Sequence, residues 1–541
     1  MRTFKQRVYH ASRSQSFLWK FALVAIGLGV VVGWALSHRP SSRTHLFGQR
    51  VLATVGLAEL DEDDVTLFPT ESPRDLLSAL ENEIRTSDVA FPVVLNAVPT
   101  LAPFVAASDF ETVSKIIATR FTADEAAFAT DYLASWNPEN RSAFERLKTR
   151  ADDAKPTRFA HYAVGRIHLK RKNYDGAYER FRLESQVGGA AAEESRAMII
   201  YTLGRAKNAA LLSQLAKDPE FARYFSPHAQ LDVAVAEKDW RGMFKWLAVT
   251  QLHSYARPVL LVTLVGGFAW AFFLFNLGEV RNVWSVTSLL CFLGFLAGAV
   301  STFPTVYLVL VEDEILHFEK GADIAHSFAY FIAGVGAREE LCKLLLFLPL
   351  LPFLIKRGDD LEALTVASFV GLGFAIEENG GYFAQSAAAS APGRFLTANF
   401  FHIALTGMNG LALFRACTRG MSGVNEFLMV LPLTIFAHGA YDALGDTTEL
   451  DGGGFFAMIV YIGFALYYFN AVHPLRTNEQ RTVSLTGSFV VGLSILTGTV
   501  IAFQMATLGA GAGATLIFSE LFSSVVLVFL FFREFHEPLT R

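Results

Sequence analysis

The stretch Arg338-Glu339-Glu340-Leu341-Cys342-Lys343 places four ionisable side chains between two apolar runs, residues 328–335 and 344–355. A charged residue at the centre of a spanning helix costs about 2.5 to 3.5 kcal/mol on the translocon scale, so it faces the protein interior or a wet cavity. The stretch therefore predicts a membrane helix with a functional site, for which other helices must supply the partners.

The composition of the chain is typical of a polytopic membrane protein. Of its 541 residues 52% are hydrophobic, 49 are Phe, and the net charge is only -5. No basic block interleaved with aromatic residues is present, so no nucleic-acid partner is expected. The three cysteines all lie in apolar runs, which predicts neither a disulfide framework nor a CxxC metal site.

The N-terminal segment, residues 1–36, predicts a membrane anchor. Four basic residues and no acid precede the apolar run 17–36, which is close to the roughly 20 residues needed to span a bilayer. His38-Arg39-Pro40 does not resemble the small-residue site of a cleaved signal peptide. We expect an uncleaved anchor with its N-terminus in the cytoplasm.

Residues 37–256 are polar, of mixed charge and of helical periodicity, which predicts one exported soluble α-helical domain. Within it, Gly165, Ala177 and Phe181 have the spacing of a tetratricopeptide repeat, and the phrase 172–178 recurs at 238–244. These matches favour repeats around residues 157–250 whose concave face binds a peptide or protein. The alternative is an irregular helical domain with chance matches.

The remainder, residues 257–541, predicts a membrane domain of nine spans, which with the anchor makes about ten in an all-α protein. The expected spans are 259–277, 284–309, 330–355, 361–382, 395–416, 424–445, 453–471, 485–506 and 514–532. Basic residues fall mainly on one side, at positions 281, 356, 357, 415, 419, 476, 481, 533 and 541. The positive-inside rule then places both termini in the cytoplasm and residues 37–256 outside it.

The opposite, outer connections are acidic and are expected to carry solvated charge. One contains Glu312, Asp313, Glu314 and Glu319, and the other contains Asp446, Glu449 and Asp451. Only two basic residues, Lys320 and Arg394, fall on this side.

Four of the predicted spans carry polar groups inside their apolar runs. These are Glu339, Glu340 and Lys343; Glu377, Glu378 and Asn379; His402; and His438 with Asp442. At 1.5 Å per residue, Glu339, Glu378, His402 and His438 lie roughly 6 to 14 Å from the outer boundary. We therefore expect four helices to bring these groups to one level, on the exported side.

The spacing within each helix predicts specific pairs. Glu339 and Lys343 are four residues apart, as are His438 and Asp442, so each pair shares a face. Glu340 is rotated by about 100° from Glu339 and need not compete for the same lysine, so which glutamate holds Lys343 stays open. An unpaired buried glutamate suits a general base, whereas a salt-bridged one stays ionised.

Together these residues resemble four motifs of the PrsW family of intramembrane proteases, relatives of the CAAX-type prenyl endopeptidases and abortive-infection membrane proteins. The motifs occur in order as EExxK (339–343), a Phe374-to-Asn379 motif, His402, and HxxxD (438–442), and the resemblance covers about residues 300–450. It implies a protease-like core in a bacterial inner membrane and a membrane-anchored protein as substrate, such as an anti-sigma factor cleaved at site 1.

The resemblance also implies roles for individual residues. Glu339 or Glu340 would activate water, and His402 and His438 would polarise the scissile carbonyl. Lys343, Phe374, Glu378, Asn379 and Asp442 would support them. No cofactor is required by the sequence, which lacks HExxH spacing, but a divalent metal such as zinc could be held by Glu340, His402 and His438.

Two other function classes fit the same sequence. Glu and His chains at membrane depth also serve proton or solute transporters, although no duplicated motif set is present. A non-catalytic scaffold that recruits proteins through the exported domain is the second alternative.

Overall fold

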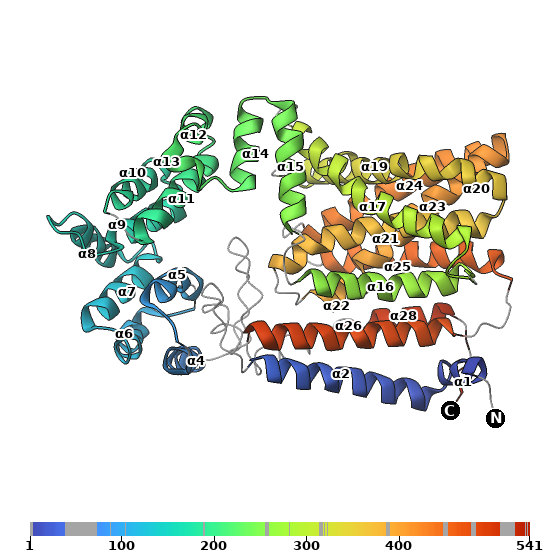
Figure 1. Cartoon of the computed structure of the whole chain (residues 1–541), viewed down its shortest axis with the longest axis horizontal. Coiled ribbons are helices and arrows are strands. Elements are labelled where there is room, and N and C mark those ends of the chain that lie inside the picture. The colour runs from blue at the N-terminus through green and yellow to red at the C-terminus, as the bar shows by residue number, and fades with distance from the viewer. Residues whose placement is uncertain are drawn as a thin grey trace. The chain divides into compact units, whose positions relative to one another are not determined.

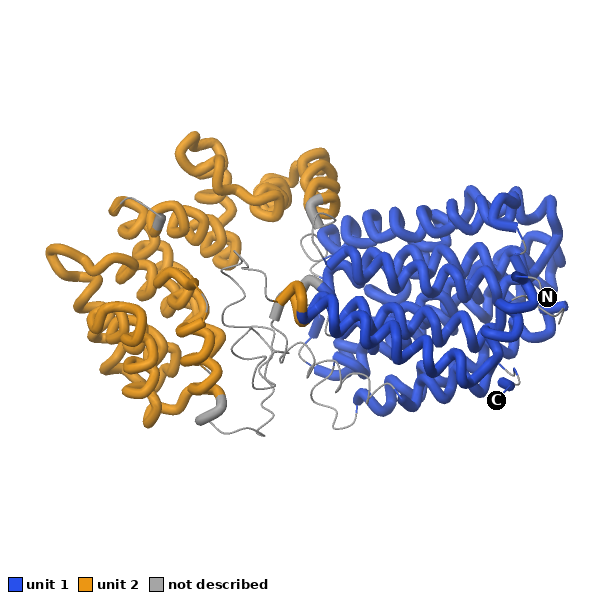
Figure 2. The backbone as a smooth tube through the Cα atoms, turned by 60° about the horizontal axis from the view of Figure 1, so that its bottom comes forward, with its two compact units in different colours: residues 1–34, 254–504, 517–541 blue, residues 35–253, 505–516 orange. Residues whose placement is uncertain are grey.

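The computed structural model describes residues 4–37, 73–86, 88–102, 104–187, 190–254, 259–280, 282–312, 318, 320–321, 323–385, 390–446, 453–477, 483–508, 525–535, 537 and 539–540. All regular elements of these residues are helices, as predicted (Figure 1). The chain divides into two compact units (Figure 2), one made of residues 1–34, 254–504 and 517–541 and the other of residues 35–253 and 505–516.

The second unit is a series of short helices. They are α4 (Pro73–Thr86), α5 (Phe91–Leu101), η2 (Ala107–Asp109), α6 (Phe110–Ala118), α7 (Ala123–Ser135), α8 (Arg141–Ala151), α9 (Ala160–Lys170), α10 (Tyr174–Ser185), α11 (Ala190–Arg205), α12 (Ala209–Ala216), α13 (Pro219–Ala222), α14 (Pro227–Ala236) and α15 (Trp240–Ser254). The apolar faces of the helices from α4 to α14 share one core, in which Ala177 and Phe181 are fully buried.

One kind of turn recurs between these helices. Lys172, Lys207 and Lys238 each have a positive φ of 51° to 55°, and each precedes an Asn or Asp at the start of the next helix. The turns lie 35 and 31 residues apart, close to the period of the predicted repeats. The Phe181 ring also fills the space beside Gly165, where an added Cβ would lie 2.8 Å from it. The assignment to tetratricopeptide repeats remains a prediction.

A buried carboxylate, Glu184 on α10, holds the start of α9. It accepts hydrogen bonds from the backbone N–H groups of Phe159, at 3.2 Å, and Tyr162, at 3.1 Å. Burial raises the pKa of Glu184 despite these bonds. Because the pKa of Glu184 is higher in the folded state than in the unfolded state, its contribution to stability is fully present below the unfolded-state pKa. This contribution is lost as pH rises through the folded-state pKa.

Glu184→Ala is expected to loosen the α9–α10 pair, because two buried N–H groups lose their acceptor at a cost of about 1 to 3 kcal/mol. Hydrogen exchange of the full-length protein should show residues 159–163 exchanging about 5- to 150-fold faster. Glu184→Gln keeps an acceptor and should remain closer to wild type while losing the local pH dependence. Unchanged exchange in the alanine variant would contradict this role.

The first unit contains the long apolar helices together with shorter helical segments. They are α1 (Phe4–Ala11), α2 (Gln15–Ser37), α16 (Leu260–Leu277), α17 (Val286–Val311), α18 (Ile324–Ala329), the π-helix η4 (Tyr330–Gly336), α19 (Ala337–Phe347), η5 (Leu348–Leu350), α20 (Leu351–Arg357), α21 (Asp360–Gln385), α22 (Ala391–Leu396), α23 (Ala398–Thr418), α24 (Met421–Asp446), α25 (Gly453–Val472), η6 (His473–Leu475), α26 (Leu485–Leu508) and α28 (Val525–Phe535).

Six helical segments of the described residues are long and apolar enough to cross a membrane: 15–37, 260–277, 286–311, 421–446, 453–475 and 485–506. They coincide with six of the ten predicted spans and establish a membrane protein. The predicted span 514–532 lies mostly outside the described residues. The predicted spans 361–382 and 395–416 correspond to the long helices α21 and α23, which carry the polar groups of the site.

The predicted span 330–355 is not one regular helix. It begins with the π-helix η4 and is interrupted by the 3₁₀ turn η5, where Pro349 and Pro352 cannot donate backbone hydrogen bonds. The charged stretch opens α19, directly after the π-helix. π-helical turns are frequent at functional sites because they re-aim the residues that follow.

Two of the acidic residues expected in outer loops form ion pairs instead. Glu312 pairs with the buried Arg338, and Asp446 pairs with Lys320. The expectation of solvated charge is wrong for Glu312, because the buried guanidinium beside the site needs a counter-charge. The other five acids lie outside the described residues.

Candidate functional site

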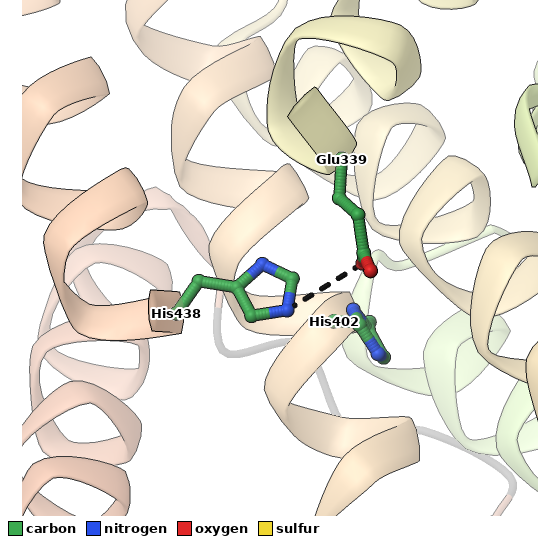
Figure 3. A group of neighbouring side chains, drawn as sticks. All are labelled: Glu339, His402 and His438. Atoms are coloured by element: carbon green, nitrogen blue, oxygen red, sulfur yellow. Dashed lines mark ion pairs between the residues drawn. The ribbon is translucent and has the colours of Figure 1, made fainter. Parts of the chain in front are cut away.

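Three buried side chains from three helices form the centre of the site. Glu339 comes from α19, His402 from α23 and His438 from α24, and they point toward one another (Figure 3). One ligand atom of each lies within 4.8 Å of the others. His438 Nε2 is 3.5 Å from Glu339 Oε2.

Close helix packing makes this convergence possible. A Cβ on Gly439, next to His438, would lie 2.4 Å from the Cα of Ile332 in η4. A Cβ on Gly371 of α21 would lie 2.2 Å from the carbonyl oxygen of His402. Only glycine allows the backbones to approach so closely, which is a common packing device between membrane helices.

Glu340 is fully buried and its carboxylate is occupied on both oxygens. Oε1 accepts from Lys343 Nζ at 2.9 Å and from His438 Nδ1 at 3.0 Å. Oε2 accepts from Asn409 Nδ2 at 3.1 Å and from Thr406 Oγ1 at 3.4 Å. A carboxylate has about four acceptor positions, so these donors saturate it.

Lys343 lies between both glutamates and His402. Its Nζ is 2.9 Å from Glu340, 3.3 Å from Glu339 and 2.9 Å from His402 Nδ1. It also lies 3.8 Å from the centre of the Phe374 ring. The sequence left open which glutamate holds Lys343. In the structure both do, because residues three apart on a helix are neighbours as well as residues four apart.

The hydrogen bonds set the tautomers of the two histidines. An ionised carboxylate only accepts, so His438 Nδ1 donates to Glu340, while Nε2 faces Glu339. Asp442, expected to orient His438, is farther away, at 3.5 Å from Nε2. An ammonium only donates, so His402 Nδ1 accepts from Lys343 and Nε2 donates to Glu378 at 3.1 Å.

Arg394, which was predicted to lie in an outer loop, joins Glu378 and Asn379. Arg394 of α22 donates through Nη2 to Glu378 at 3.0 Å and through Nε to Asn379. Its guanidinium stacks 3.7 Å over the Tyr382 ring, and Asn379 bonds onward to Asn399. Arg394 therefore positions the carboxylate that contacts His402.

Arg394→Gln should lower kcat of the proposed activity by about 10- to 100-fold with little change in KM. This is the usual range for a residue that positions a side chain in contact with a site residue, as Arg394 positions Glu378. Arg394→Lys keeps the charge but loses the two-pronged contact, so it should fall between wild type and Arg394→Gln. Equal kcat values for all three proteins in a steady-state cleavage assay would exclude this positioning role.

Asn409 and Thr406 lie on the same helix as His402, and both donate hydrogen bonds to Glu340. Thr434 of α24 in turn donates to Asn409 Oδ1 at 2.8 Å. The signal that predicts them is the polar series 402, 406 and 409, which follows one face of an otherwise apolar helix.

The donor set fits a divalent metal ion. One carboxylate and two imidazoles are a common catalytic zinc set, and tetrahedral ligands at zinc bond lengths lie about 3.3 Å apart, close to the Glu339–His438 separation. With neutral imidazoles, the carboxylates of Glu339, Glu340, Glu378 and Asp442 exceed the cations Lys343 and Arg394 by two charges. The group contains Glu339, whereas Glu340 was the glutamate expected.

These features define a helical membrane protein with a buried glutamate–histidine centre. The model of the PrsW family intramembrane metalloproteases matches residues 287–469, a segment that contains every site residue named above. This match confirms the family resemblance predicted from the four motifs. No curated protein and no solved structure matched the chain.

Proposed function

We propose that the protein is an intramembrane endopeptidase that hydrolyses a peptide bond of a membrane-anchored protein. The observation that carries this proposal is the buried group of Glu339, His402 and His438 inside the segment that matches a metalloprotease family. Its hydrogen-bonded surroundings support a preorganised centre, as catalysis requires.

The two adjacent glutamates have different roles in this proposal. Glu340 is saturated by four donors and orients His438, so it acts as a structural carboxylate. Glu339 keeps one ion pair with Lys343 and faces His438 Nε2, so it is the group that holds or deprotonates the attacking water. Lys343 lies where an ammonium can stabilise the oxyanion that develops on the scissile carbonyl, and His402 accepts a hydrogen bond from it.

A metal ion bound by Glu339, His402 and His438 would supply Lewis-acid polarisation of the carbonyl and of water. His402 can join such a set only when one of its present contacts opens. The contact of His402 with Lys343 is the one that faces the two glutamates. Moving the Lys343 ammonium away would also free Glu339 from its hydrogen bond with Lys343.

The proposal extends to location and partners. The family match favours a bacterial inner membrane. Positive-inside charge favours cytoplasmic termini, a site near the extracytoplasmic face and export of residues 37–256. The exported domain would recruit or screen the substrate, for which a membrane-anchored anti-sigma factor cleaved at site 1 is the class implied by the family.

Co-expression with a candidate single-span substrate tests the proposal. Wild type should release a fragment whose new terminus maps near the extracytoplasmic end of the substrate span, and His438→Ala and Glu340→Gln should not. Equal cleavage by all three proteins would refute the assignment. Flux of protons or solute through reconstituted wild type, abolished in Glu378→Gln, would favour the transporter alternative instead.

A further inference from the structure

Helix α15 has an exposed surface that the proteolytic site does not use. Trp240 is 45% exposed, Phe244 58% and Leu252 67%, which is unusual for large apolar side chains of one short helix. Arg241 and Lys245 are exposed beside them. We define these five residues as the α15 surface.

The α15 surface is a single face of the helix. At 100° per residue its five members fall within an arc of about 140°. The buried residues of the helix, Met243, Leu247 and Thr250, lie outside this arc, on an adjacent one of about 60°. The exposed face of an ordinary surface helix is polar. The exposed face of α15 instead combines aromatic, aliphatic and basic side chains.

The chain holds this surface near the bilayer. α15 ends at Ser254 and the candidate span α16 begins at Leu260, so only five residues separate them. Six peptide units reach at most about 20 Å, which keeps the end of α15 close to the headgroup region of the membrane.

The charge of α15 agrees with a lipid partner. Residues 240–254 contain Arg241, Lys245 and His253 and no acidic residue. Interfacial helices carry Trp, Phe or Leu on their apolar face, and Lys and Arg are attracted to anionic headgroups. A helix with this composition lies in the plane of the interface with its apolar side chains at the headgroup–acyl boundary.

We propose that α15 is an interfacial helix that binds the surface of the bilayer through the α15 surface, with a preference for anionic lipid. It anchors the end of the helical unit on the membrane from which α16 departs. The proposal does not depend on the proteolytic function.

Lipid quenching in full-length protein tests this contact. A bimane label is attached at Phe244→Cys or Leu252→Cys in a Cys417→Ser background, because Cys417 is exposed whereas Cys291 and Cys342 are buried. Ser142→Cys on the exposed face of α8 is the matched control. The proteins are reconstituted in phosphatidylcholine–phosphatidylglycerol vesicles containing lipid brominated near the headgroup or deep in the chain.

Shallow bromines should quench the labels at 244 and 252 at least about twofold and the label at 142 not at all, with deep bromines less effective. Aqueous iodide should show the reverse order. In the Arg241→Gln/Lys245→Gln background, the quenching should no longer increase with anionic lipid. Labels quenched by iodide like the control, or shielded from both quenchers by another protein surface, would overturn the proposal.

Discussion

Glu339→Gln is expected to lower kcat/KM for substrate cleavage by about 10³-fold, because the amide cannot accept the proton of the attacking water. The change keeps the shape of the side chain, which accepts a hydrogen bond from Lys343 at 3.3 Å. The fold should therefore persist while the chemistry is lost, and steady-state cleavage by purified protein in liposomes measures this directly.

Glu377→Gln is the matched control for this prediction. Glu377 also lies in a Glu-Glu pair, on the long helix α21, but it lines a pocket with residues of α16 and α17 such as Leu264 and Phe295. The kcat/KM of Glu377→Gln should stay within about twofold of wild type, because Glu377 lies outside the group of Glu339, His402 and His438. If Glu339→Gln stayed near wild type while Glu340→Gln lost all activity, the roles of the two glutamates would be reversed.

Lys343→Met is expected to destabilise the membrane domain by about 3 to 5 kcal/mol, because removing one partner of a buried ion pair leaves the other charge uncompensated. Lys343 is completely buried and is the ammonium that contacts both Glu339 and Glu340. Thermal unfolding in detergent should show a clear decrease in Tm.

The double variant Lys343→Met/Glu340→Gln separates charge from packing. It removes one buried carboxylate together with the ammonium, so it should recover most of the lost Tm. Lys356→Met, at an exposed position near the end of α20, is the control and should leave the Tm unchanged. A double variant as unstable as Lys343→Met alone would show that packing, not charge, sets the effect.

The convergence of the site could be predicted from the sequence because membrane burial limits where charge can lie. Span limits and charge asymmetry were enough to place Glu339, Glu378, His402 and His438 at one depth, and the structure brings them together. The individual contacts could not be predicted in this way, since they depend on the rotation of each helix about its axis. Lys343 therefore proved to be shared between both glutamates, and Glu340 rather than Asp442 contacts His438 most closely.

The irregular parts of the fold could not be predicted from the hydrophobic periodicity of the sequence. The π-helix η4 is selected by close packing of Gly336 and Gly439 between η4 and α24, a tertiary contact that local pattern does not show. Arg394 appeared to be a loop charge because sequence position alone does not show that α22 folds back toward Glu378.

Removal and return of metal tests the central claim most directly. Purified wild-type protein in liposomes is stripped with a chelator, assayed for cleavage of a single-span substrate, and assayed again after addition of one equivalent of zinc, with bound metal measured in parallel. We predict that stripping abolishes cleavage, that zinc restores it, and that Glu339→Gln and His438→Ala neither retain the metal nor recover. Full cleavage by the metal-free protein would contradict the account.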